Sequence, residues 1–192
     1  MAVLLLSIGF AAQAGDSSGE ATIDSTALEK EVFRRINAHR RESGRAPFVY
    51  DEAVAAIARG HSLAMARGRS GFGHGRFDAR MAEVSARVEL AGMAENVSKH
   101  QRSANFAEAA VTQWLASRPH RANIDGDYSL TGVGAARGED GTVYFTQLFV
   151  RVCQGPLTET PSWRCCISVG AYTHQGGWRL IPYLRLRQEA GT

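Results

Sequence analysis

The segment QWLASRPHRANI, residues 113–124, carries a tryptophan on the apolar face of a predicted helix and a histidine where that helix should stop. Pro119 disfavours continuation of the helix, so His120 falls at its end. A histidine there can interact favourably with the C-terminal end of the helix dipole. It can also belong to a site assembled from distant parts of the chain. The segment alone leaves both interpretations open.

The residues on either side predict helices first and strands afterwards. Apolar positions recur at helical spacing in 25–44, 48–68, 77–88 and 105–117, and the last of these segments opens with a capping box. Residues 93–98 read as a short extended or turning piece. TGVGAAR (131–137) and TVYFTQLFV (142–150) are β-type runs separated by the turn sequence GEDG. Helices followed by an antiparallel hairpin predict an α+β layered domain.

Composition indicates a globular protein and argues against nucleic acid as a partner. The chain has 192 residues, of which 44% are hydrophobic and 21% charged, with a net charge of +3. These values are typical of a folded soluble domain. Lys30 and Lys99 are the only lysines, and the arginines are scattered among Asp and Glu. Such a distribution is typical of a solvated surface, and no zinc-finger, helix-turn-helix or RNA-binding motif accompanies it.

The N-terminus predicts export. An apolar run from Ala2 to Ala12 is followed by the small-x-small pattern Ala-Gln-Ala, which suits cleavage by a signal peptidase. The run is too short for a stable membrane span, so an integral membrane protein is not expected. It lacks the usual positive n-region. A buried helix is the alternative, but residues 15–22 are small and polar. We therefore expect a signal peptide over 1–14, a linker over 15–24 and a secreted or periplasmic bacterial protein.

The last part of the chain, residues 152–192, differs from the rest. It shows no sustained periodicity and holds all three cysteines, Cys153, Cys165 and Cys166. A bridge from Cys153 to either of the others is possible in an oxidising compartment, whereas adjacent cysteines rarely pair. The segment can be a small β appendage, a disordered tail or a frameshifted reading of the gene. We assign it no function.

Three residues suited to metal binding stand in separate segments. His74 lies in GFGHGRF, Glu95 in MAENVS, and His120 follows Pro119. Two imidazoles and one carboxylate form a common three-ligand zinc set with an open fourth position. No HExxH or CxxC pattern joins the three in sequence, so helix-end and packing roles remain the alternative.

The order of these motifs resembles the CAP superfamily, which comprises cysteine-rich secretory proteins, antigen five and pathogenesis-related proteins of the first class. RINAHRR and the later ARGHSLAMA match its first two helices, and FGHGRF matches its F-S-H loop. AENVS matches the G-E-N signature with Ala94 in place of glycine. WLASRPHRANI matches a bacterial W-xx-S-xx-H-R-x-N-I motif, and TGVGAAR with VYFTQLFV matches the closing strands. The resemblance covers roughly residues 28–150.

The resemblance implies a fold and a site. The family fold is an α-β-α sandwich with a small antiparallel sheet between helical layers, here over residues 25–151. It implies that His74, Glu95 and His120 meet in a surface cavity, where they bind a divalent metal in several members. The second glutamate of the eukaryotic tetrad is replaced by Ser117. The remaining residues expected to line the cavity are His61, Asn96 and Arg121; His61 is expected to pack, and Arg121 to cover the edge or pair with an acid.

The resemblance favours binding over catalysis. A zinc ion at these residues would activate water, but hydrolysis also needs a general base, and no residue is assigned that role by its sequence context. We therefore expect a secreted binding module for a lipid, sterol, cell-envelope or host ligand, with zinc as its only candidate cofactor. A zinc-dependent hydrolase using the same cavity is the alternative. The sequence does not decide whether the protein is an enzyme.

Overall fold

The computed structural model describes residues 24–153, 169–172 and 178–181. The predicted signal peptide, most of the predicted linker, and Cys165 and Cys166 lie outside the described residues. The helices are α1 (Ser25–Glu42), α2 (Glu52–Ala66), α3 (Phe77–Ser85), α4 (Phe106–Ala116) and α5 (Arg118–Ile124). The strands are β1 (Val49–Tyr50), β2 (Leu90–His100), β3 (Leu130–Arg137), β4 (Val143–Val152), β5 (Val169–Tyr172) and β6 (Trp178–Ile181).

The main sheet has the strand order β1-β3-β4-β2. Strands β3 and β4 form the predicted antiparallel hairpin, and β2 pairs antiparallel to the other side of β4. The three long strands are antiparallel, as predicted, and the short strand β1 pairs parallel to β3, so the sheet as a whole is mixed. The two residues of β1 join α1 to α2, and so short a strand carries no periodic signal of its own in the sequence.

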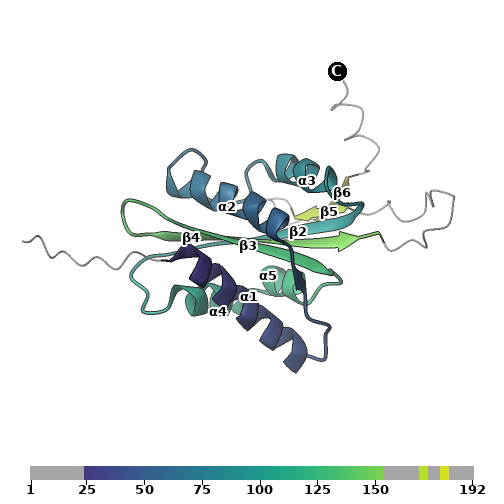
Figure 1. The fold of residues 1–192 in the computed structure, drawn as a ribbon, viewed down its shortest axis with the longest axis horizontal. Helices are drawn as coiled ribbons and strands as arrows, with labels where there is room; N and C mark the ends of the chain where they lie inside the picture. Colours follow the sequence, from purple (N-terminus) through teal and green to yellow (C-terminus); the bar gives the residue numbers. More distant parts are fainter. Residues whose placement is uncertain (1–23, 154–168, 173–177, 182–192) are drawn as a thin grey trace, which may run out of the picture.

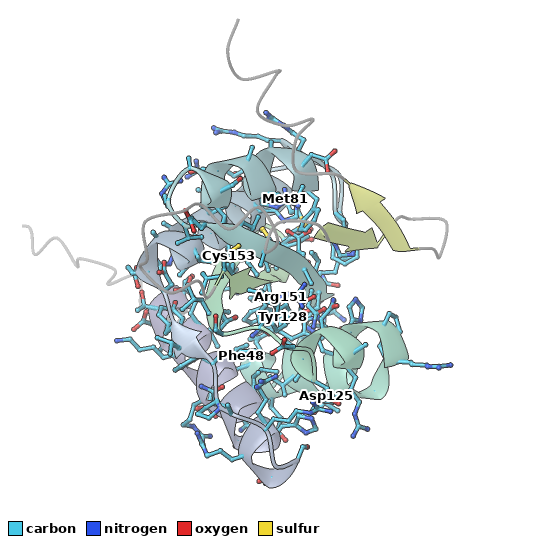
Figure 2. All side chains as sticks on the ribbon, turned by 90° about the vertical axis from the view of Figure 1, so that its right-hand side faces the viewer. Phe48, Met81, Asp125, Tyr128, Arg151 and Cys153 are labelled. Carbon is cyan, nitrogen blue, oxygen red and sulfur yellow. The ribbon has the colours of Figure 1, made fainter. Side chains whose placement is uncertain are left out.

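Helices cover both faces of this sheet, which confirms the α-β-α sandwich (Figure 1). Helices α1, α4 and α5 lie on one face, and α2 and α3 lie on the other. Each layer has its own apolar cluster, and Phe48 and Met81 mark the two sides (Figure 2). Strand β4 contributes to both clusters: Phe145 and Phe149 pack toward α1 and α4, and Leu148 packs toward α2 and α3. This is the period-two alternation of a strand buried on both faces.

Two predicted elements are wrong in extent. Residues 93–98 are extended, which was one of the two alternatives, but they are the middle of the eleven-residue strand β2 rather than a short piece, and β2 is buried on both faces over Leu90–Ser98. A strand buried on both faces shows no alternation in sequence. Pro119 does not end a helix either: α4 ends at Ala116, and Pro119 stands in the first turn of α5. Its missing N–H costs nothing there, because first-turn N–H groups have no helical partner.

Strands β5 and β6 lie within the segment left unassigned by the sequence. They pair antiparallel as a separate two-stranded sheet, and β5 lies beside β2 (Figure 1). Within the described part of the chain, no helix has the length and apolar character that crossing a bilayer requires.

Candidate functional site

Glu95 is the centre of a buried polar cluster on the α2 and α3 face of the sheet. It occupies the middle of β2, and its side chain is 2% exposed. Arg80 of α3 holds both carboxylate oxygens, with Nε 2.7 Å from Oε2 and Nη2 2.8 Å from Oε1. A third bond from Arg80 Nη1 to the carbonyl of Gly75 measures 2.8 Å. The guanidinium is thus fixed by a bidentate, charge-assisted pair and a loop carbonyl.

His74 reaches the same carboxylate from the glycine-rich loop before α3. Its Nδ1 lies 2.9 Å from Glu95 Oε1, and its side chain is one-third exposed. The loop turns sharply to achieve this: Gly73 has a φ of 128°, which only glycine adopts readily, and Arg76 has a φ of 59° just before the helix begins. The structure therefore brings together two of the three predicted ligands, His74 and Glu95.

His61 of α2 is the third side chain at this carboxylate. It is 95% buried, and its Nδ1 lies 3.2 Å from Thr146 Oγ1 and 3.6 Å from Glu95 Oε2. Thr146 also accepts a hydrogen bond from Ser62 Oγ at 2.9 Å. The other ring nitrogen, Nε2, is buried with no hydrogen-bond partner among the described residues. His61 therefore packs as predicted but also faces the site.

The backbone carbonyl of His120, in α5, is held by a side chain on the opposite face of β2. Successive side chains of a strand point to opposite faces, so Asn96, next to Glu95, faces α5. Its Nδ2 donates to the His120 carbonyl at 3.0 Å, and its Oδ1 accepts from Asn123 at 2.9 Å. The His120 Nδ1 is buried without a hydrogen-bond partner among the described residues. Burial lowers the pKa of His120, and the nearby charge of His74 lowers it further.

Within the described part of the chain, the two remaining predicted site residues, Ser117 and Arg121, form no hydrogen bond or ion pair with the cluster. Ser117 links α4 to α5 and makes no side-chain capping bond. Arg121 is exposed, and its Nε lies 3.3 Å from Asp125 Oδ2, so it pairs with an acidic residue, one of the two roles foreseen for it.

Sequence reasoning missed Arg80, which makes the strongest contacts to Glu95. One signal could have found it. Arg80 stands three residues after Phe77 and four before Val84, and both of these belong to the apolar cluster under α3. A cation on the apolar stripe of a helix needs a buried anion, because an unpaired buried charge is costly.

These residues do not fit a resident divalent cation as they stand. Among the described residues, no three His, Cys, Asp or Glu side chains are arranged to hold a metal ion. Both Glu95 oxygens accept hydrogen bonds from a guanidinium that cannot lose its charge. Arg80 and His74 occupy three of the roughly four lone-pair sites of the carboxylate, and the charge of Arg80 repels a cation. The set His74, Glu95 and His120 stays a prediction, and the ion pair argues against it.

The charge states in the cluster follow from burial and pairing. Burial alone would raise the pKa of Glu95, but hydrogen bonds from His74 and Arg80, together with the positive charge of Arg80, lower it below its ordinary value. Burial lowers the pKa of His61 from 6.5 to about 4, despite the attraction of Glu95. At neutral pH the cluster is therefore an ion pair between Arg80 and Glu95 beside a neutral His61 imidazole.

The buried His61 makes folding stability depend on pH. Between pH 6.5 and 4 the unfolded chain binds a proton at His61 that the folded chain does not, so the free energy of unfolding falls as the pH is lowered. The expected loss from pH 7 to pH 4 at this site is about 2–3 kcal/mol. The lowered pKa of Glu95 adds a loss in the same direction.

Urea denaturation of wild type and His61→Asn at pH 7, 5.5 and 4 measures this effect. The variant should lose less stability over that range. Arg87→Met, which only breaks a surface pair with Glu83, should leave the wild-type pH dependence unchanged. If the free energy of unfolding falls equally with pH in wild type and His61→Asn, His61 is not the group that makes stability depend on pH.

Comparison with known proteins relates this chain to a known family. The family model of the cysteine-rich secretory protein family, CAP, matches residues 33–149. An uncharacterised membrane protein of Bacillus subtilis is 32% identical over 134 residues, which are 66% of this chain and 35% of that protein. This chain thus spans about a third of the length of that relative.

Solved structures show the same fold. An outer surface protein of Borrelia burgdorferi superimposes with a TM-score of 0.59 at 16% identity, covering 68% of this chain and 97% of that one. An extracellular protein of Bacillus anthracis containing an SCP domain has a TM-score of 0.56 at 24% identity, covering 70% and 45%. With the family model covering most of the sandwich, this chain belongs to the cysteine-rich secretory protein (CAP) family.

Proposed function

We propose that this protein is an exported binding module for an anionic amphiphile, such as a lipid of the cell envelope. The observation that carries the proposal is an exposed aromatic side chain in a basic loop beside the buried cluster. Phe72 is 49% exposed and stands two residues before His74. Exposed aromatic groups flanked by cations suit the boundary between lipid headgroups and acyl chains.

The positive charge around Phe72 favours an anionic partner. The segment 67–76, RGRSGFGHGR, holds Arg67, Arg69 and Arg76, all exposed, and no acidic residue. Lys99 of β2 lies over the Phe72 ring, with Nζ 4.9 Å from the ring centre. Each basic group near an anionic lipid surface contributes roughly 1 kcal/mol of attraction. Aromatic insertion and headgroup pairing would act together at this loop.

Export is part of the proposal. The N-terminal leader predicted from the sequence supports it. Two relatives of the same fold are described as an outer surface protein and as an extracellular protein.

Binding is favoured over the alternative, a zinc-dependent hydrolase. Hydrolysis at the predicted site would need Glu95 as a metal ligand and a second group as general base. Glu95 is already held by Arg80, and Glu108 is exposed at the start of α4, where its backbone N–H is capped by Asn105. Among the described residues, no contact in the cluster supplies the general base that hydrolysis requires.

Vesicle flotation tests the proposal. Full-length protein should float with vesicles containing phosphatidylglycerol and not with vesicles of phosphatidylcholine alone. Phe72→Ser should weaken the partition about tenfold, because it removes a large part of the inserted apolar area. Val49→Ser, at an apolar site on β1 that is 63% exposed and lies at the other edge of the sheet, should have no effect.

Other outcomes would contradict the proposal. Equal flotation with both vesicle types would exclude an anionic headgroup as the ligand. Binding only to phosphatidylcholine vesicles that contain cholesterol would indicate a sterol ligand instead. No flotation with any vesicle would leave a soluble envelope or host protein as the partner class and overturn the lipid proposal.

A further inference from the structure

We propose that His74 holds the loop of residues 67–76 in its lipid-binding conformation by tying it to the buried Glu95 carboxylate. His74 is thereby a positioning residue. It sets the affinity for an anionic lipid surface through the placing of Phe72, and not through contact with the lipid. The inference rests on the proposed function and deepens it, because it explains how the loop is kept ready to bind.

The loop has little structure of its own to fix its shape. Residues 68–70 donate backbone hydrogen bonds to the last turn of α2, and the Phe77 N–H returns to the His74 carbonyl at 3.1 Å. Between them, over residues 71–76, no backbone N–H donates a hydrogen bond to a described residue. Three of these six residues are glycine, the residue that loses the most conformational freedom on ordering. The conformation of this stretch therefore depends on contacts to the rest of the domain.

The buried ion pair supplies those contacts. His74 Nδ1 lies 2.9 Å from Glu95 Oε1. The carbonyl of the next residue, Gly75, accepts a hydrogen bond from Arg80 Nη1 at 2.8 Å. Arg80 also holds both oxygens of Glu95, at 2.7 and 2.8 Å, which fixes the carboxylate in place. The contacts form a closed ring, so one ion pair on a rigid strand holds the loop by a side chain and by the adjacent backbone.

These contacts position Phe72 without touching it. Its ring lies 4.9 Å from Lys99 Nζ and 6.5 Å, centre to centre, from the ring of Tyr144. Both neighbours are at the surface and leave the ring 49% exposed, so they hold it less firmly than charge-assisted hydrogen bonds hold His74. A free loop would lose its conformational entropy on binding a lipid surface. The anchored loop has lost that entropy already on folding, and this favours binding.

Flotation and tryptic cleavage at pH 7 test the inference on four full-length proteins: wild type, His74→Ala, His74→Asn and His39→Ala. With vesicles containing phosphatidylglycerol, His74→Ala should partition about fivefold more weakly than wild type, because its binding conformation is only partly populated. Without lipid, trypsin should cleave His74→Ala about fivefold faster within the loop, which holds three exposed arginines, because local opening admits the protease. His74→Asn retains an N–H donor toward Glu95 and should match wild type in both measurements.

His39→Ala is the matched control. His39 also contacts a carboxylate at 2.9 Å, that of Asp125, but it belongs to α1 on the other face of the sheet. This variant should change neither flotation nor cleavage of the loop. Both His74 variants should fold, because the His74 side chain is one-third exposed and Glu95 keeps its two bonds from Arg80.

Three results would overturn the inference alone. One is His74→Ala floating as well as wild type, and another is a His74→Ala loop that trypsin cleaves no faster. The third is His74→Asn binding as weakly as His74→Ala, which would show that the imidazole itself meets the lipid. Failure of the proposed function differs from these, because it appears in wild type. A wild-type protein that floats with no vesicle would overturn the lipid proposal and this inference with it.

Discussion

Replacing Gly134 with alanine should lower the free energy of unfolding by about 3–4 kcal/mol, because the new methyl group has no space. A Cβ atom at Gly134 would lie 2.2 Å from the backbone nitrogen of Arg59 and 2.3 Å from the carbonyl carbon of Ala58. These are backbone atoms of α2, so no side-chain rotation relieves the clash. The helix must move away from the sheet and open the packing of its whole layer.

The same close approach occurs one turn earlier in the helix. A Cβ at Gly132 would lie 2.2 Å from the backbone nitrogen of Ala55. Two residues along a strand advance the chain by about 6.7 Å, and four residues along a helix by about 6 Å. Gly132 and Gly134 therefore meet α2 at successive turns, which is why β3 needs glycine at both positions.

Urea denaturation of Gly134→Ala against wild type measures this effect, and Gly60→Ala is the matched control. Gly60 lies in α2 itself, and a Cβ there would have no heavy atom within 4 Å. The control should be stabilised by about 0.5–1 kcal/mol through its higher helix propensity. A Gly134→Ala protein as stable as wild type would show that α2 does not pack directly on β3.

Replacing Arg80 with methionine should lower the free energy of unfolding by about 3–5 kcal/mol. The variant leaves the Glu95 carboxylate buried without its bidentate partner and removes the bond to the Gly75 carbonyl. Arg87→Met, which breaks a surface pair with Glu83, should cost less than about 1 kcal/mol. The two expected losses of stability differ because Arg80 is buried and Arg87 is exposed.

A double-mutant cycle with Glu95→Gln checks the cause. If the cost of Arg80→Met comes from the uncompensated carboxylate, neutralising Glu95 as well should recover about 2 kcal/mol or more of it. Additive effects of the two substitutions would show that the ion pair is not the reason for the loss. Chemical denaturation of the four proteins at pH 7 provides the cycle.

The helices were the most predictable part of the fold, because local signals specify them. Asp51 and Asn105 cap α2 and α4, and Asn105 accepts from the backbone of Glu108, as the capping box predicted. Strand β2 was not predictable in extent, since both of its faces are covered and its sequence LAGMAENV shows no alternation. The split between α4 and α5 was missed because proline can begin a helix as well as end one.

The candidate site was predictable in part. His74 and Glu95 were singled out from motif order, and the structure brings their side chains to 2.9 Å. Arg80 was not singled out, because an arginine within a helix of mixed composition usually faces solvent. Its role depends on α3 packing over β2, which sequence spacing does not report.

By itself, the sequence determined the helices, the β3–β4 hairpin, the family and the two residues His74 and Glu95, because each rests on local periodicity or on a motif order that a linear chain displays. Only the tertiary structure decided what those residues are paired with. The alternation of β2 sends Glu95 toward α3 and Asn96 toward α5, and the layer above Glu95 supplies a buried arginine. Which charge neutralises a buried carboxylate depends on which side chains pack against it. That packing is established only when the helical layers pack onto the sheet.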